Sequence, residues 1–309
     1  MIKIKENVPL APYTNYKIGG NARYFCKASN GQEIIEALEF AHKKNVPIFI
    51  LGGGTNVLVS DKGFSGLVIK LQVISLKLQE DTIVVGAGTL LSGIVSFALK
   101  NGLQGLEWAS GIPGTIGGAI RGNAGAFDGA VEDVVKSVRC LNIEQRELID
   151  FTKKEIGFEY RSSLIKTTGD FIVLSATLKL KKANNIQELE NAKKKTRQLI
   201  QHRKEKHPLD RPSCGSIFKN ANINEIKNNK ELLKNIKNDS IPAALLISKS
   251  GLGGEKIGNA QISKKHSNFI VNLGGAKAKD VMDLIKISQR EVSGKFGVKL
   301  EPEVQFIGF

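Results

Sequence analysis

The stretch that decides the fold is Leu51-Gly52-Gly53-Gly54-Thr55-Asn56-Val57-Leu58-Val59, in which two apolar runs flank three consecutive glycines. The apolar run over residues 46–51 predicts a buried strand, and residues 57–59 predict a second strand directly after the turn. Glycine reaches positive φ, so such a turn lets several N–H groups converge on an oxyanion. Thr55 and Asn56 add side-chain donors. The pattern indicates a phosphate-binding turn, with an ordinary tight turn as the alternative.

Two familiar nucleotide motifs are missing from the chain. A P-loop ends in Gly-Lys-Ser/Thr, and this triplet does not occur. A dinucleotide fingerprint needs GxGxxG between a strand and a helix, whereas residues 86–91 read GAGTLL and place Leu91 where the third glycine belongs. A nucleotide bound by this chain is therefore expected to be held in another way.

A second glycine-rich segment spans residues 102–129, with nine glycines in 28 residues. Unlike a low-complexity linker, it keeps Trp108, Ile112, Ile116 and Phe127 among the glycines. This mixture predicts a folded loop that packs against a flat surface. A large planar ring beside backbone N–H and C=O groups would explain both glycine-rich sites at once.

The remaining pattern predicts an α+β protein in two globular parts. Helices are expected over residues 29–45, 91–101, 187–206 and about 280–296, and further strands over 67–71, 82–85, 171–180, 268–273 and 304–307. Ser29 and Gln32 are expected to form a capping box, and Gly102 and Gly297 to end their helices. The basic helix is interpreted as the hinge between the two parts.

Composition excludes several classes of protein. The 309 residues carry 45 Lys and Arg against 30 Asp and Glu, a formal charge of +15. Lysines are scattered and lack interleaved aromatic residues, which argues against a nucleic-acid partner, while the positive field suits an anionic small molecule. The longest apolar run has six residues, and a membrane helix needs about 20. No secretory signal is recognised, so a cytoplasmic protein is expected.

Metal and disulfide chemistry are not predicted. The three cysteines are far apart and form no CxxC pair, and the four histidines stand alone. No GxSxG nucleophile motif is present.

Seven motifs, taken together and in order, resemble the UDP-N-acetylenolpyruvoylglucosamine reductases, flavoenzymes of peptidoglycan synthesis, and within them the type II branch. The motifs lie at residues 15–20 (NYKIGG), 51–59 (LGGGTNVLV), 111–118 (GIPGTIGG), 123–127 (NAGAF), 160–163 (YRSS), 212–218 (PSCGSIF) and 303–308 (EVQFIG).

The resemblance implies an FAD-binding domain of the vanillyl-alcohol-oxidase-like (PCMH) type over residues 21–185, after an N-terminal segment 1–20. A connecting helix 186–206 and an α+β substrate-binding domain 207–309 follow. NADPH is the implied reductant, and the implied product is UDP-N-acetylmuramate. Residues 43–107 contain neither His nor Cys, so noncovalent FAD is expected. The oligomeric state is left open, with a monomer as the working expectation.

The resemblance also implies three catalytic residues: Arg161 to stabilise charge on the substrate, Ser216 to donate the proton, and Glu303. Glu301 is the alternative to Glu303, and Ser213 and Cys214 are the alternatives to Ser216.

Cofactor and substrate residues follow by the same comparison. FAD is expected to contact Gly52, Gly53, Gly54, Thr55, Asn56, Ser110, Gly111, Pro113, Gly114, Gly117, Gly118, Asn123 and Gly125. Tyr160, Lys219, Asn220 and His266 are candidates for the substrate. Gly253 and Gln305 depart from the charged residues of type I members and leave the diphosphate contacts open. The competing hypotheses are a flavin-dependent oxidase or dehydrogenase of another small substrate, and a non-catalytic protein that binds nucleic acid.

Overall fold

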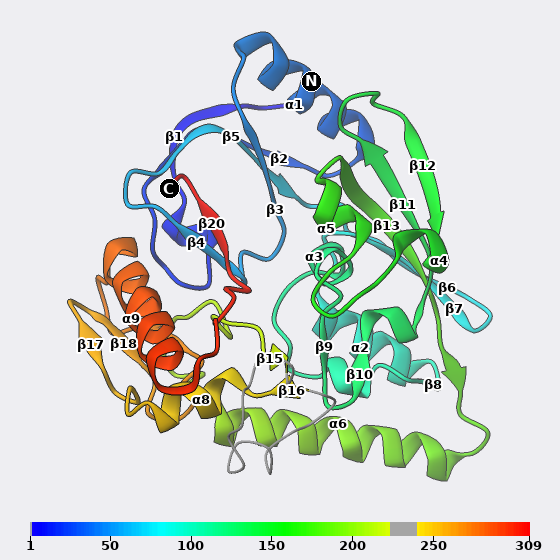
Figure 1. Cartoon of the computed structure of the whole chain (residues 1–309). Coiled ribbons are helices and arrows are strands. Elements are labelled where there is room, and N and C mark those ends of the chain that lie inside the picture. The colour runs from blue at the N-terminus through cyan, green and yellow to red at the C-terminus, as the bar shows by residue number, and fades with distance from the viewer. Residues whose placement is uncertain (1, 223–239) are drawn as a thin grey trace. The chain divides into compact units, whose positions relative to one another are not determined.

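The computed structural model describes residues 2–222 and 240–309 (Figure 1). The chain forms two compact units, each assembled from separate stretches of sequence. Unit 1 comprises residues 2–8, Arg23–Gly53 and Ser65–Arg203, and unit 2 comprises Pro9–Ala22, Gly54–Phe64 and the described part of Lys204–Phe309. Helices and sheets occur in both units, so the predicted α+β class is confirmed.

The first sheet carries the strand that leads into the triple-glycine turn. Its order is β1-β2-β5-β3, with bounds Lys5–Pro9, Asn21–Ala28, Phe64–Leu71 and Ile48–Leu51. β3 runs parallel to β5, with Ile48 opposite Leu67. Helix α1 (Gly31–Lys44) connects β2 to β3 and buries Ile34 and Leu38 in the core of unit 1. The predicted strand at residues 46–51 is therefore confirmed, beginning two residues later.

The start of α1 corrects the predicted capping box by one position. Asn30, not Ser29, is the N-cap, and its side chain accepts a hydrogen bond from the Glu33 N–H at 2.9 Å. The Glu33 carboxylate in turn accepts the Ser29 N–H at 2.7 Å and the Ser29 hydroxyl at 2.8 Å. The assignment to Ser29 and Gln32 was wrong because Asn caps as well as Ser, and an ionised Glu is the stronger acceptor.

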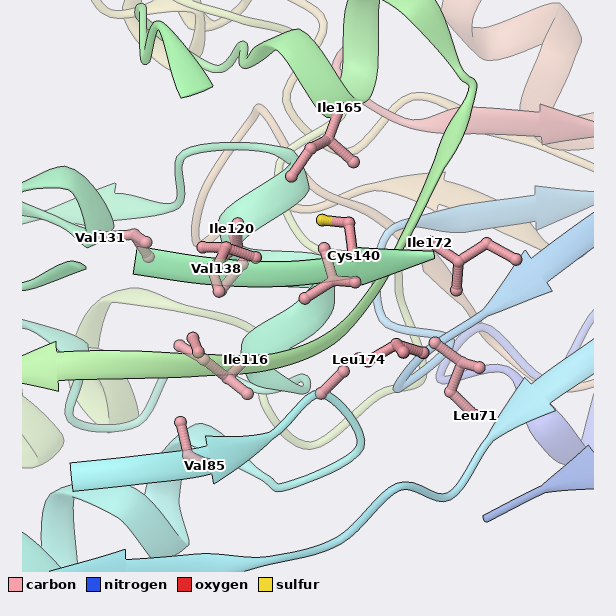
Figure 2. Close-up of a cluster of buried hydrophobic side chains, with 14 of the residues drawn as sticks. Leu71, Val85, Ile116, Ile120, Val131, Val138, Cys140, Ile165, Ile172 and Leu174 are labelled. Carbon is pink, nitrogen blue, oxygen red and sulfur yellow. The ribbon is translucent and has the colours of Figure 1, made fainter. Parts of the chain in front are cut away.

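The second sheet is antiparallel and supports the glycine-rich segment. Its order is β12-β11-β13-β7-β6, with bounds Leu148–Thr152, Val135–Asn142, Phe171–Lys179, Thr82–Gly86 and Leu76–Gln79. Ile172, Leu174 and Ala176 of β13 are buried, as their alternation predicts. Figure 2 shows Ile116 and Ile120 among the buried side chains of these strands, including Val85 and Val138.

Residues 102–129 form a chain of short elements rather than one loop. They are β8 (Leu103–Gln104), the 3-10 turn η2 (Glu107–Ala109), helix α3 (Ile116–Arg121), β9 (Gly125–Ala126) and β10 (Gly129–Ala130). A Cβ at Gly117 would lie 2.9 Å from the Cβ of Ala87, so glycine lets α3 approach the chain after β7 closely. Helix α3 contacts β13 and β7 of the five-stranded sheet, whereas packing against a planar ring stays a prediction.

Unit 2 has its own core. The antiparallel sheet of β17 (Lys256–Ile257), β18 (Ala260–Ile262) and β19 (Ile270–Asn272) packs with helices α8 (Ala243–Lys249) and α9 (Ala278–Phe296). Strand β4 (Val57–Val59), directly after the glycine turn, runs parallel to the C-terminal strand β20 (Gln305–Ile307). The turn therefore lies between strands of two different sheets.

The long basic helix is α6 (Ile186–Lys206), and its predicted bounds are confirmed within one residue. The predicted helices at residues 91–101 and 280–296 correspond to α2 (Leu91–Lys100) and α9, which ends at Gly297 with a φ of +71°. Over residues 2–222 and 240–309, no helix has the length and apolar character that a membrane crossing requires.

Candidate active site

The triple-glycine turn presents donors that no protein group uses. Three of its carbonyl oxygens accept hydrogen bonds: Asn15 donates its N–H to Gly54 O at 2.9 Å, Gln305 donates to Asn56 O at 3.1 Å, and the Lys70 ammonium contacts Gly52 O. Within the described ranges, none of the five N–H groups of residues 52–56 donates a hydrogen bond to the protein. A run of backbone donors without acceptors is the arrangement that binds an oxyanion.

Steric constraints explain the glycines of this turn. Gly54 has a φ of +68°, and a Cβ there would lie 2.1 Å from the Tyr13 carbonyl oxygen. A Cβ at Gly52 would lie 2.8 Å from the hydroxyl oxygen of Thr115, which precedes α3. Gly52 of the triple-glycine turn therefore lies close to Thr115 of the second glycine-rich segment. Both segments are expected to contact the same cofactor.

The second segment is fixed by backbone hydrogen bonds on both sides of Thr115. Leu91 donates to Gly114 O and Ile116 donates to Thr89 O, each at 3.0 Å. Gly111 and Gly114 have φ values of +74° and +124°, which favour glycine strongly. These contacts hold residues 110–118 against the chain that follows β7.

Arg161 is hydrogen-bonded to the later part of the second glycine-rich segment, also in unit 1. Its guanidinium donates to Asn123 O at 3.3 Å and to Gly125 O at 2.8 Å, and it lies 5.3 Å from the ring centroid of Tyr160. The Asn123 amide group donates to Glu132 at 3.0 Å and to Glu159 O at 3.0 Å. The predicted catalytic arginine is thus joined to two predicted cofactor-binding residues.

Four of the nine non-glycine residues with positive φ in the described ranges are Arg161 and three residues of the segment to which it is hydrogen-bonded. Asn123, Phe127, Asp128 and Arg161 have φ values of +40°, +51°, +62° and +54°. Non-glycine residues rarely adopt such values, and those that do cluster at ligand-binding and catalytic sites. The surrounding structure maintains these conformations, in part through the hydrogen bonds of Asn123 and Arg161.

Ser216 lies in a hydrogen-bonded stretch of unit 2. It forms an antiparallel bridge with Phe269, and Ile217 donates its N–H to Asn268 O at 2.8 Å. The buried Asn268 side chain accepts the Phe218 N–H at 2.9 Å and donates to Phe218 O at 2.8 Å. Backbone on both sides of the serine is therefore fixed, with Ser216 itself half-buried.

The two candidate carboxylates have different surroundings in unit 2. Glu303 is half-buried, donates its N–H to Ile217 O at 2.7 Å, and accepts the Asn56 amide at its carbonyl at 3.1 Å. Burial raises the pKa of the Cys214 thiol well above its usual range, and the Glu303 carboxylate adds to this pKa shift. Glu301 is exposed and forms an ion pair with Lys219 at 2.9 Å.

Comparison with known proteins agrees with these observations over the whole chain. Residues 207–307 match the family described as the C-terminal domain of UDP-N-acetylenolpyruvoylglucosamine reductase, and residues 22–151 match an FAD-binding domain family. The enzyme of this name from Caldanaerobacter subterraneus subsp. tengcongensis is 40% identical, over 99% of this chain and 94% of its own. The chain belongs to the UDP-N-acetylenolpyruvoylglucosamine reductase family.

Other members of the reductase family support the assignment. The Clostridium novyi reductase is 37% identical over 99% of this chain and 92% of its own. The crystal structure of the Thermus caldophilus reductase is similar with a TM-score of 0.79 and 31% identity, covering 99% of this chain and all of that one. The expected family and the FAD-binding domain are confirmed.

The residues of this reductase-family chain fit an FAD molecule. The turn at residues 52–56 offers five backbone donors without protein acceptors in the described ranges, and side chains are sterically excluded at Gly52 and Gly54. The buried Ser110 hydroxyl also has no hydrogen-bond partner among the described residues. Phosphate oxygens and the polar atoms of a flavin are acceptors of the kind that these groups require.

The four predicted substrate residues differ in their contacts and in their exposure to solvent. Lys219 pairs with Glu301, and the side-chain oxygen of Asn220 accepts the Ala243 N–H at 3.3 Å, near the start of α8. Tyr160 is 54% exposed beside Arg161. Burial lowers the pKa of His266, whose ring centroid lies 4.8 Å from that of Phe269.

Sequence reasoning missed two residues that shape these sites. Asn268 holds the backbone around Ser216, but its position just before a short apolar run gave no sign of that role. Arg203 contacts the second glycine-rich segment, and its position in a run of surface lysines concealed it. Burial and partners, which one sequence does not reveal, distinguish both residues from their neighbours.

Proposed function

We propose that this protein catalyses the NADPH-dependent reduction of the enolpyruvyl group of UDP-N-acetylenolpyruvoylglucosamine to the lactyl ether of UDP-N-acetylmuramate. The reaction supplies a peptidoglycan precursor. The proposal rests on the Arg161 guanidinium, which donates hydrogen bonds to the carbonyl oxygens of Asn123 and Gly125 in a chain that belongs to the reductase family. The family assignment and the unpartnered donors of the glycine turn support it.

FAD would be held noncovalently by the glycine-rich segments. The turn at residues 52–56 would surround the pyrophosphate with N–H groups. The flavin and ribityl side would be lined by Ser110, Gly111, Pro113, Gly114, Gly117, Gly118, Asn123 and Gly125. FAD held there would supply the hydride-transfer chemistry between NADPH and the substrate. We assign no residue to NADPH.

Arg161 would stabilise the charge that develops on the substrate. Hydride arrives at one carbon of the enolpyruvyl double bond, so negative charge develops on the adjacent carbon and its carboxylate. A fixed cation stabilises such charge with little reorganisation. Glu303 would polarise the carboxylate or orient the catalytic groups. Ser216 would donate the proton that completes the reduction at the adjacent carbon.

Tyr160, Lys219, Asn220 and His266 are proposed to contact the substrate, and residues 207–309 are the proposed substrate-binding region. The UDP-sugar and NADPH are anionic, which suits a chain of formal charge +15. A cytoplasmic location and independence from nucleic acid remain part of the proposal.

The deciding experiment follows NADPH oxidation by the purified, yellow holoprotein with and without the enolpyruvyl sugar nucleotide. Substrate-dependent oxidation with formation of UDP-N-acetylmuramate is expected. Rapid reaction of the reduced protein with oxygen, and none with the sugar nucleotide, would instead identify an oxidase of another small substrate. A colourless protein that binds DNA with a steep salt dependence would favour the nucleic-acid alternative.

Gly53→Val is expected to yield mostly apoprotein, because a branched side chain would intrude where backbone donors meet the pyrophosphate. The ratio of visible flavin absorbance to protein measures the loss. Gly93→Val is the matched control, since Gly93 is exposed on α2 and nothing lies within 4 Å of its added Cβ. Full flavin content in Gly53→Val would contradict the placement of the pyrophosphate.

A further inference from the structure

Arg203 is a buried cation on the basic helix α6, whose other charged side chains are mostly exposed to solvent. It lies near the end of α6 and is only 9% exposed, whereas Lys204 and Arg197 on the same helix are exposed. Burial lowers the pKa of its guanidinium. Removing an arginine from water is costly unless its charge is compensated, so its position requires a specific interaction.

Its contacts are directed at the second glycine-rich segment. The Arg203 Nε–H donates to the carbonyl oxygen of Ser110 at 2.9 Å, and the guanidinium carbon lies 4.9 Å from the ring centroid of Phe127. A Cβ on Gly111 would lie 2.8 Å from Cδ of Arg203, so the stem of the arginine packs directly on that glycine. One side chain thereby joins α6 to two parts of the second glycine-rich segment, residues 110–111 and Phe127.

Two buried donors remain unused in this cluster. Neither Nη2 of Arg203 nor the Ser110 hydroxyl has a hydrogen-bond partner among the described residues, and Ser110 is 2% exposed. Buried donors of this kind normally find an acceptor, and leaving one unpaired destabilises the folded protein. Since the described residues offer no acceptor to either donor, an acceptor-rich ligand would satisfy both.

We propose that Arg203 is a positioning residue of the flavin site. It fixes Ser110 and Gly111 through the Ser110 carbonyl and, with the Ser110 hydroxyl, offers donors to the acceptor atoms of the bound flavin. The inference rests on the proposed function, because it takes residues 110–118 as the flavin-lining segment. It extends that function to a helix that lies outside the predicted FAD-binding domain.

The test is a titration of apoprotein with FAD, followed by the fluorescence of Trp108. This is the only tryptophan in the chain, and it lies in η2, two residues before Ser110, so its emission reports on the segment that Arg203 holds. Arg203→Met removes the charge and the donors but keeps most of the stem. Arg197→Met is the matched control, an exposed arginine on the same helix.

Arg203→Met is expected to raise the FAD dissociation constant about tenfold or more, in line with the loss of hydrogen bonds from a charged donor. The emission of Trp108 in the apoprotein should shift to longer wavelength, while Arg197→Met changes neither quantity. Ser110→Ala should weaken FAD binding without shifting that emission, since the carbonyl held by Arg203 is retained.

A rise of less than threefold in Arg203→Met overturns the inference. If Arg203→Met does not fold, Arg203→Lys is the deciding variant, because lysine keeps the positive charge but lacks the additional nitrogen donors of the guanidinium. A raised dissociation constant in Arg203→Lys at unchanged melting temperature supports the role, and wild-type affinity overturns it. If the unmodified protein itself binds no FAD, the proposed function fails instead, so the two failures are distinct.

Discussion

Arg161→Ala is expected to lower the turnover of NADPH with the enolpyruvyl substrate by roughly 10²-fold or more, the scale of a removed electrostatic group. The substrate would lose the cation that stabilises charge on its carboxylate. Steady-state kcat, expressed per bound flavin, is the measurement, because Arg161 also holds the carbonyls of Asn123 and Gly125. Expressing turnover this way separates lost chemistry from lost cofactor.

The control for this variant is another arginine of unit 1. Arg139 forms an exposed ion pair with Asp150 at 2.7 Å on the five-stranded sheet, and such pairs contribute little to stability. Arg139→Ala should keep wild-type turnover. Arg161→Lys should recover part of the lost activity through its charge alone, although it cannot bridge two carbonyls as the planar guanidinium does. Wild-type turnover per flavin in Arg161→Ala would remove Arg161 from the mechanism.

Glu303→Ala is expected to show a loss of the same order, roughly 10²-fold or more. Glu301→Ala supplies the matched comparison two residues away. Glu301 is exposed and paired with Lys219, so its removal should leave turnover within a few-fold of wild type. Activity retained by Glu303→Ala and lost by Glu301→Ala would transfer the catalytic role to Glu301.

The sequence revealed the parts of the fold that depend on local rules. Three glycines between two apolar runs predicted the turn and both flanking strands, because chain reversal and strand periodicity are properties of neighbouring residues. It did not reveal that β4 and β3 belong to different sheets, since pairing of β4 with β20 joins residues about 250 positions apart.

Long-range contacts limited the prediction of the candidate site. Motif likeness singled out Arg161, Ser216 and Glu303, but only the folded chain shows the Arg161 guanidinium on Gly125 O or the Asn56 amide on Glu303 O. Arg203 has no such motif. Its neighbours His202 and Lys204 are equally polar, and burial alone distinguishes the arginine.

Ser216→Ala should separate two half-reactions. Reduction of the bound flavin by NADPH, read as bleaching of its visible absorbance, should proceed at a near-normal rate because it needs no proton from Ser216. Reoxidation by the enolpyruvyl substrate should slow by roughly 10²-fold or more, the contribution of a positioned general acid. Stopped-flow absorbance measures each step, and Ser213→Ala is the control on the same segment.

Cys214 is the competing proton donor, and its surroundings argue against it. A thiol is intrinsically a better acid than a hydroxyl. In this protein, however, Cys214 is 2% exposed, and burial together with the Glu303 carboxylate raises its pKa well above the usual range. Ser216 is half-buried and follows Gly215, whose φ of +83° turns the chain between the two side chains. Cys214→Ala should therefore keep rapid reoxidation. Normal turnover in Ser216→Ala, with slow reoxidation in Cys214→Ala, would show that the thiol supplies the proton.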